Sequence, residues 1–110
     1  MNQWEIYDYP FAAEGSHPVL IVSSTARSGN EAFEELNGLF CRSVRSDFQP
    51  KPIHFLLDEA DGLDRPTAVR CDHIYVLRRD FIGSRRGIVS FPRRLPLFRK
   101  VVECFQCPPR

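Results

Sequence analysis

Arg70 and Asp72 are the two side chains of this sequence best suited to chemistry at a developing negative charge. They lie two positions apart in residues 67–77, which have the pattern of a strand, so both should lie on one face. An arginine keeps its proton, so Arg70 suits electrostatic stabilisation of an anion. Asp72 is then either a general base or the carboxylate that holds Arg70 in place. The competing interpretation is a structural ion pair on a strand.

His17 is the second candidate for chemistry, because it stands just before the buried apolar run at residues 19–23. A histidine side chain changes its charge near neutral pH, so this residue type can act as an acid or a base. A loop histidine with no role is the alternative. His54 and His73 flank predicted strands and are interpreted as structural.

The positive charge of the chain is concentrated in its second part. The net charge is only +1, but residues 1–64 carry −7 and residues 65–110 carry +8. Of the 15 basic residues, 13 are arginines, whose planar guanidinium group suits paired contacts with phosphate. This distribution predicts local binding of nucleic acid. The alternative is a solvated basic face.

Short strands followed by one helix must position these residues. Apolar runs and alternating patterns predict strands at residues 4–9, 19–23, 39–44, 53–57 and 67–77. Residues 31–36 are interpreted as one or two helical turns. Pro10 is expected to end the first strand.

The last segment has helical spacing of its apolar residues, after Ser90 as N-cap, and Pro96 is expected to delay the regular helix. Within residues 67–77, Tyr75 is expected to share a face with Val69 and Cys71. Strands first and a helix last predict one mainly β domain over residues 1–110, a small curved sheet or barrel with a C-terminal helix.

The sequence does not indicate a metal, a cofactor or a membrane segment. Cys104 and Cys107 form a single CxxC pair, which is weak evidence for zinc without a second pair at zinc-like spacing. Cys41 and Cys71 are predicted as small buried strand residues. The longest apolar run, residues 18–22, is far too short to span a bilayer, and no secretory signal is visible. We therefore expect a cytoplasmic protein with reduced thiols and no cofactor.

Three segments together resemble the PemK/MazF family of bacterial toxin endoribonucleases. They are GSHPVLIVS at residues 15–23, DGL at 61–63 followed by VRCDHI at 69–74, and RGIVS at 86–90. No segment is specific alone, but their order and spacing are, and the resemblance covers roughly residues 3–106. It implies an SH3-like barrel with a C-terminal helix. It also implies metal-independent cleavage of single-stranded mRNA, a homodimer and inhibition by a cognate antitoxin.

The resemblance also assigns residues to the site. It places Arg70 and Asp72 in the active site, and His17 where the family usually has an arginine before proline. Where the family has two hydroxyl residues that contact the scissile phosphate, Ser46 keeps one hydroxyl and Arg45 replaces the other. The expected catalytic residues are Arg70, Asp72, His17 and Ser46, and the expected RNA-binding residues are Arg45, Ser43, Arg42 and Arg78.

A binding protein of the same fold is the competing function. A relative that has lost cleavage would bind RNA or protein only. Another version is a protein like the gyrase inhibitor CcdB, which shares the fold but targets a protein. The Arg70–Asp72 pair favours the ribonuclease. Phe48 and Phe11, in loops near the expected site, are candidates for stacking on bases, or else they anchor their loops onto the core.

Overall fold

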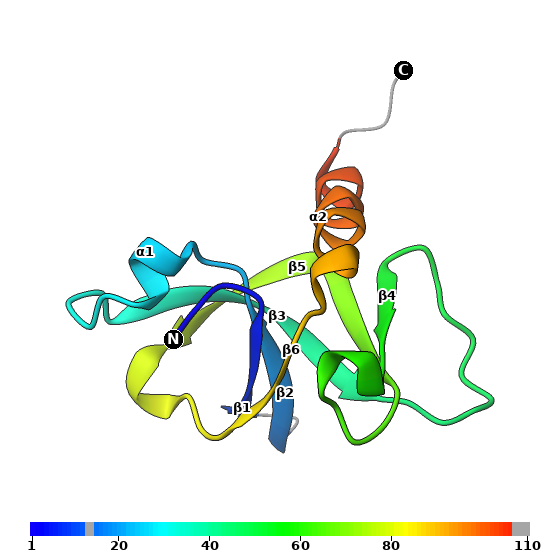
Figure 1. The fold of residues 1–110 in the computed structure, drawn as a ribbon, viewed down its shortest axis with the longest axis horizontal. Coiled ribbons are helices and arrows are strands. Elements are labelled where there is room, and N and C mark those ends of the chain that lie inside the picture. Colours follow the sequence, from blue (N-terminus) through cyan, green and yellow to red (C-terminus); the bar gives the residue numbers. More distant parts are fainter. Residues whose placement is uncertain (13–14, 107–110) are drawn as a thin grey trace.

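The computed structural model describes residues 1–12 and 15–106. The main elements are six strands and a 15-residue helix that follows the last strand (Figure 1). Single turns of helix lie between some of the strands. In chain order the elements are β1 (Glu5–Phe11), β2 (Gly15–Ile21), α1 (Thr25–Ser28), β3 (Glu35–Ser43), β4 (His54–Leu57), η1 (Glu59–Asp61), β5 (Thr67–Arg78), η2 (Arg79–Phe81), β6 (Arg85–Ile88) and α2 (Phe91–Phe105).

All six strands belong to one antiparallel sheet of order β4-β5-β3-β2-β1-β6. The sheet is strongly curled, and α2 projects from one end of it (Figure 1). This confirms the predicted architecture, a small barrel-like sheet with a C-terminal helix. Among the described residues, no helix combines the length and the apolar character that crossing a membrane would need.

Two groups of buried side chains form the core. The first packs the sheet against α2 and includes Ile6, Leu20 and Leu97, which are fully buried. Cys41 and Cys71 belong to this group, as predicted, and burial raises the pKa of both thiols. The second group lies on the opposite face of the sheet, since Val19 and Ile21 alternate with Leu20 along β2. It contains Tyr9, Val19, Ile21, Leu36 and Leu77.

Two predicted boundaries at prolines are wrong, for reasons of hydrogen bonding. β1 continues through Pro10 to Phe11, because its pairing with β6 stops at Tyr7 and a proline is tolerated on an edge segment. α2 begins at Phe91 with Ser90 as its N-cap, as predicted, but Pro96 lies inside the helix and does not delay it. Pro96 is six positions into α2, so it removes only one early bond of the helix.

Residues 31–36 are also not the predicted helical turns. The chain makes a one-turn helix earlier, at Thr25–Ser28, where the Ser24 side chain accepts a bond from the Arg27 amide. β3 then begins at Glu35. Local polarity favoured a helix here, but pairing of Glu35 with Arg78 across β3 and β5 decides the conformation.

β5 departs from regular pairing in its middle. Leu39 pairs with Ile74 and Cys41 with Val69, so residues 70–73 of β5 lie opposite a single residue of β3. Such a bulge bends a strand and changes the direction of its side chains. On its other side, this part of β5 pairs with β4, and Arg70 lies opposite His54.

The bulge overturns one predicted face of β5. Tyr75 does not share a face with Val69 and Cys71, because it packs beside the second core group while they belong to the first. The strict alternation of a strand therefore holds on each side of residues 70–73 but not across them.

Asp61 joins η1 to the start of α2. Its side chain is fully buried and accepts bonds from the backbone amides of Ser90, at 2.7 Å, and Asp58, at 3.0 Å. It also pairs with the guanidinium of Arg93. Gly87 packs so closely against η1 that a β-carbon there would clash with the backbone carbonyl oxygen of Asp61, so this contact requires glycine.

Candidate active site

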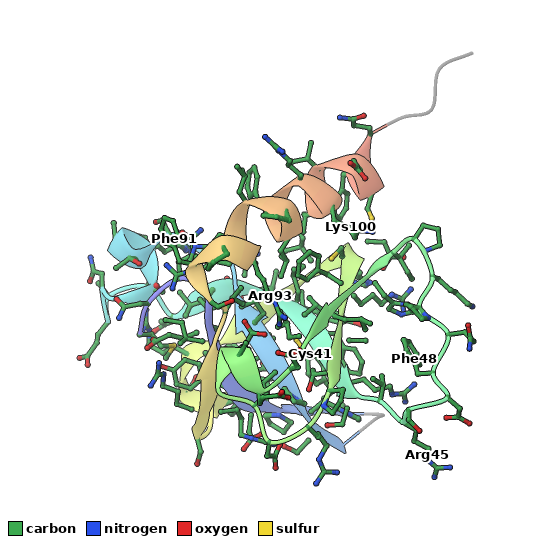
Figure 2. All side chains as sticks on the ribbon, turned by 45° about the vertical axis from the view of Figure 1, so that its right-hand side comes forward. Cys41, Arg45, Phe48, Phe91, Arg93 and Lys100 are labelled. Carbon is green, nitrogen blue, oxygen red and sulfur yellow. The ribbon has the colours of Figure 1, made fainter. Side chains whose placement is uncertain are left out.

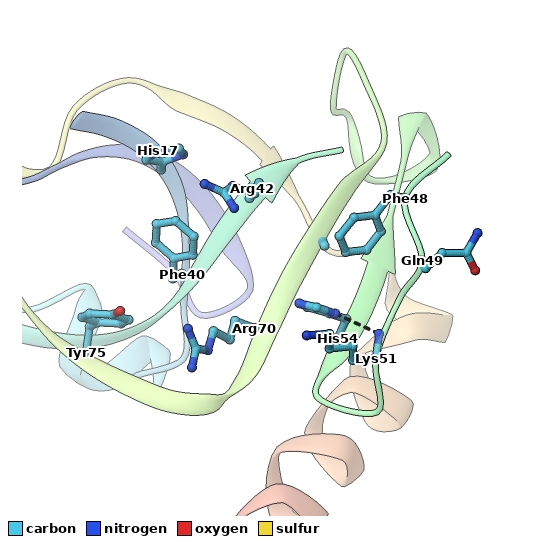
Figure 3. Close-up of a pocket in the computed structure, with 10 residues that line it drawn as sticks. His17, Phe40, Arg42, Phe48, Gln49, Lys51, His54, Arg70 and Tyr75 are labelled. Atoms are coloured by element: carbon cyan, nitrogen blue, oxygen red, sulfur yellow. Dashed lines mark hydrogen bonds between the residues drawn. The ribbon is translucent and has the colours of Figure 1, made fainter. Parts of the chain in front are cut away.

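A cavity of about 490 Å³ opens on the side of the sheet where β2, β3, β4 and β5 come together (Figure 3). Its walls combine positive charge with aromatic rings, and its described lining contains no carboxylate. A positive groove with aromatic platforms is the usual design for binding single-stranded nucleic acid. The lining residues are His17, Phe40, Arg42, Phe48, Gln49, Lys51, His54, Ala68, Arg70 and Tyr75.

The order of strands in the sheet assembles this lining. β3 lies between β2 and β5, so it brings Phe40 and Arg42 between His17 of β2 and Arg70 of β5. Phe40 and Arg42 are two positions apart on β3 and therefore share a face. The bulge in β5 allows Arg70 and Tyr75 to line the same cavity although they are five positions apart.

Arg70 and Asp72 form an ion pair on the outer face of β5. The Nε of Arg70 donates to Oδ1 of Asp72 at 2.7 Å, and a second nitrogen donates to Oδ2 at 3.4 Å. These bonds hold the pKa of Asp72 below its ordinary value, so its carboxylate stays ionised. A carboxylate engaged in this way is a weak base and a good anchor for the guanidinium.

His17 lies at the junction of two cavities. Its ring is 5.0 Å from that of Phe40, centre to centre. A second cavity of about 400 Å³ also contains His17 and Arg42, and it continues the first. Its lining residues are Ser16, His17, Pro18, Arg42, Ser43, Arg65 and Arg86.

The other predicted site residues are more scattered. Ser43 lines the second cavity, whereas Arg45 and Ser46 are exposed in the turn after β3 and line neither cavity among the described residues. Figure 2 shows Arg45 extending from this turn into solvent. Arg78 lies at the far end of β5, where it pairs with Glu35 of β3, and it lines a different cavity.

The two phenylalanines proposed for stacking have different places. Phe48 lines the cavity, and its ring packs edge-to-face with that of His54, with the ring centres 5.2 Å apart. Phe11 instead packs against the rings of Phe40 and Tyr75, at 5.0 and 5.2 Å. Phe11 therefore supports two aromatic walls of the cavity.

His54 and Lys51 are cavity residues that the sequence did not identify. His54 was interpreted as structural, and its pairing with Arg70 across β4 and β5 has no signal in the sequence. The backbone amide of Lys51 donates to Nδ1 of His54 at 3.0 Å. Burial and the nearby charges of Lys51 and Arg70 lower the pKa of His54.

None of the cysteines in the described part of the chain lines this cavity. Over residues 1–12 and 15–106, no group of His, Cys, Asp or Glu side chains is arranged to hold a metal ion. Cys104 is half-buried on α2, and Cys107, the other half of the CxxC pair, lies outside the described residues.

No protein-family model and no curated protein matches the sequence. The fold does match solved structures along nearly their whole length. An endoribonuclease in complex with its cognate antitoxin, from a mycobacterial species, has a TM-score of 0.79 at 20% identity, with 100% of this chain and 99% of that chain covered. The Mycobacterium tuberculosis toxin MazF-mt6 has a TM-score of 0.77 at 16% identity, with 92% and 95% covered. A MazE–MazF structure from Deinococcus radiodurans has a TM-score of 0.68 at 16% identity, with 98% and 97% covered. The chain therefore has the fold of these MazF-type toxins.

Proposed function

We propose that this protein is a toxin endoribonuclease that cleaves single-stranded RNA without a metal, through the ribose 2′-hydroxyl. The observation that carries the proposal is the cavity in which His17, Arg42 and Arg70 meet three aromatic rings. Positive charge suits the RNA backbone, and the rings suit unpaired bases. The likeness in fold to structures described as endoribonucleases and toxins supports the same activity.

The reaction needs a base, an acid and fixed positive charge. The 2′-oxygen loses its proton and forms a bond to phosphorus, while the bond to the 5′-oxygen breaks and that oxygen gains a proton. The products are a 2′,3′-cyclic phosphate and a 5′-hydroxyl. We propose that Arg70, oriented by Asp72, stabilises the negative charge that develops on the phosphate, and that His17 transfers the proton.

This proposal predicts cleavage of a long single-stranded RNA in the presence of EDTA. The products should carry the two end groups named above, and single-stranded DNA, which lacks the 2′-hydroxyl, should stay intact. End-group analysis and gel electrophoresis measure both. Cleavage that requires a divalent metal, or cutting of DNA, would contradict the mechanism. RNA that is bound but never cut would favour a barrel that only binds.

His17 is expected to transfer a proton, which glutamine cannot do. Because general acid–base catalysis contributes 10²-fold or more, His17→Gln should lower the cleavage rate by about 100-fold. Glutamine is a polar side chain of similar size, so the midpoint temperature of thermal unfolding should change little. Single-turnover kinetics at saturating RNA measure the rate. A His17→Gln variant with the wild-type rate would show that His17 has no part in proton transfer.

We also propose a homodimer and an antitoxin as partners. Val19 and Ile21 are fully buried within this chain, so the apolar run at residues 19–23 leaves little surface for a dimer contact. α2 carries an exposed apolar stripe at helical spacing, and a row of large exposed apolar side chains fits a protein partner. The protein used in the cleavage assay should sediment as a dimer. The stripe consists of Phe91, Leu95, Phe98, Val102 and Phe105.

A further inference from the structure

His54 faces the same cavity as Arg70 from the neighbouring strand. The two residues are direct partners in the pairing of β4 with β5, and both line the cavity. Side chains at directly opposed positions of neighbouring strands lie on one face and within reach of a common ligand. His54 is half-buried, and the Phe48 ring packs against it.

One hydrogen bond determines which nitrogen of His54 carries the proton. The backbone N–H of Lys51 can only donate, so Nδ1 of His54, at 3.0 Å, must accept. In a neutral imidazole the proton then resides on Nε2. In Figure 3 the ring edge that faces Lys51 carries this bond, and the opposite edge is directed toward β5 and Arg70.

The surroundings of the ring favour its neutral form. Burial of the ring is the main cause of its lowered pKa, and the cations Lys51, Arg70 and Lys100 act in the same direction. Asp72 opposes them, but it is engaged by Arg70. Protonation on Nδ1 would also break the bond from Lys51. His54 is therefore a neutral donor among cations at pH 7.

We propose that the Nε2–H of His54 donates a hydrogen bond to a phosphate oxygen of the RNA, next to the phosphate that Arg70 contacts. This inference rests on the proposed function and adds a contact to the substrate. A donor without charge among Arg42, Lys51 and Arg70 contributes direction rather than more positive potential. The Nε2–H of His54 therefore favours RNA bound with a phosphate oxygen at one position of the cavity.

Two substitutions separate the two nitrogens of His54. His54→Asn keeps an acceptor near the position of Nδ1 for the Lys51 amide and removes the Nε2 donor. His54→Gln places an amide N–H near the position of Nε2 and loses the acceptor. Affinity for a 2′-O-methyl RNA oligonucleotide, which cannot be cleaved, is measured by fluorescence anisotropy at several salt concentrations.

We expect His54→Asn to weaken binding about tenfold, as for a lost bond to a charged group, and His54→Gln to stay within about threefold of wild type. The slope of log affinity against log salt should not change in His54→Asn, because no charge is lost. Lys51→Ala, which removes a cation, should reduce that slope by about 0.7. Wild-type affinity in His54→Asn would overturn the proposal, as would a reduced salt slope.

The tautomer can be measured without any substitution. Long-range ¹H–¹⁵N spectra of the wild-type protein at pH 7 should show His54 protonated on Nε2 only, with a shift when the oligonucleotide binds. A ring protonated on Nδ1, or on both nitrogens, would contradict the proposal even if a variant failed to fold.

The outcome separates this inference from the proposed function. If the wild-type protein cleaves unmodified RNA and His54→Asn matches it in affinity and rate, only the role of His54 is wrong. If the wild-type protein binds the oligonucleotide as predicted but cleaves no RNA, the contact stands and the ribonuclease activity fails. If it binds no RNA, both fail.

Discussion

Replacing Arg70 by alanine is expected to reduce RNA cleavage by about 10²–10³-fold, equivalent to about 2.7–4 kcal/mol of transition-state stabilisation. The guanidinium lines the cavity and donates two hydrogen bonds to Asp72, so it is positioned before the substrate arrives. Single-turnover rates at saturating RNA measure the change. Arg99→Ala is the matched control, because it removes an exposed cation of α2 and should leave the rate unchanged.

The same substitution should have little effect on folding. The side chains of Arg70 and Asp72 are 47% and 28% exposed, and exposed ion pairs contribute only about 0–1 kcal/mol. Because the pKa of Asp72 is lowered in the folded state, any contribution is present above its unfolded-state pKa and is lost as the pH falls through the folded value. The small stability difference should therefore be constant between pH 5 and pH 8. If Arg70→Ala unfolds the protein and its refolded fraction remains active, the ion pair is structural.

Replacing Asp61 by alanine is expected to lower the free energy of unfolding by about 3–5 kcal/mol, the range for breaking a buried charged pair. The substitution leaves the amides of Ser90 and Asp58 without their acceptor and removes one partner of Arg93. These bonds join η1 to the start of α2, and α2 inserts Leu97 into the core. The loss should therefore affect the whole fold. Denaturant unfolding followed by circular dichroism measures it.

Glu59→Ala is the control for Asp61, because Glu59 is exposed in the same short helix. Its effect on the free energy of unfolding should stay within about 0.5 kcal/mol. An Asp61→Ala variant less than 1 kcal/mol below wild type would show that the link between η1 and α2 contributes little to stability.

The sequence predicted the elements that depend on local pattern. The continuous apolar run at residues 19–23 and the alternation in residues 67–77 predicted two central strands, and the observed β2 and β5 overlap both. Helical spacing from Leu95 to Phe105 predicted α2. In β2 and β5 the predictions succeeded because the pattern of apolar residues reflects which sides of a strand are buried. In α2 the same kind of spacing belongs to the exposed apolar stripe, whereas the buried residue is Leu97.

The sequence also predicted that Arg70 and Asp72 meet, from their spacing of two positions on one strand, and the two side chains form an ion pair within the bulge of β5. The resemblance to MazF-type toxins likewise selected His17, and the structure places it in the same cavity as Arg70. Whether these side chains perform the reaction is what the variants of Arg70 and His17 test.

Only the tertiary structure decided which residues complete the cavity. His54 joins Arg70 through the pairing of β4 with β5, and Tyr75 joins it because the bulge at residues 70–73 interrupts the alternation of β5. Arg78, on the same strand, lies at another cavity. Pairing register and bulges depend on contacts between segments distant in sequence, and the pattern of one strand contains no record of them.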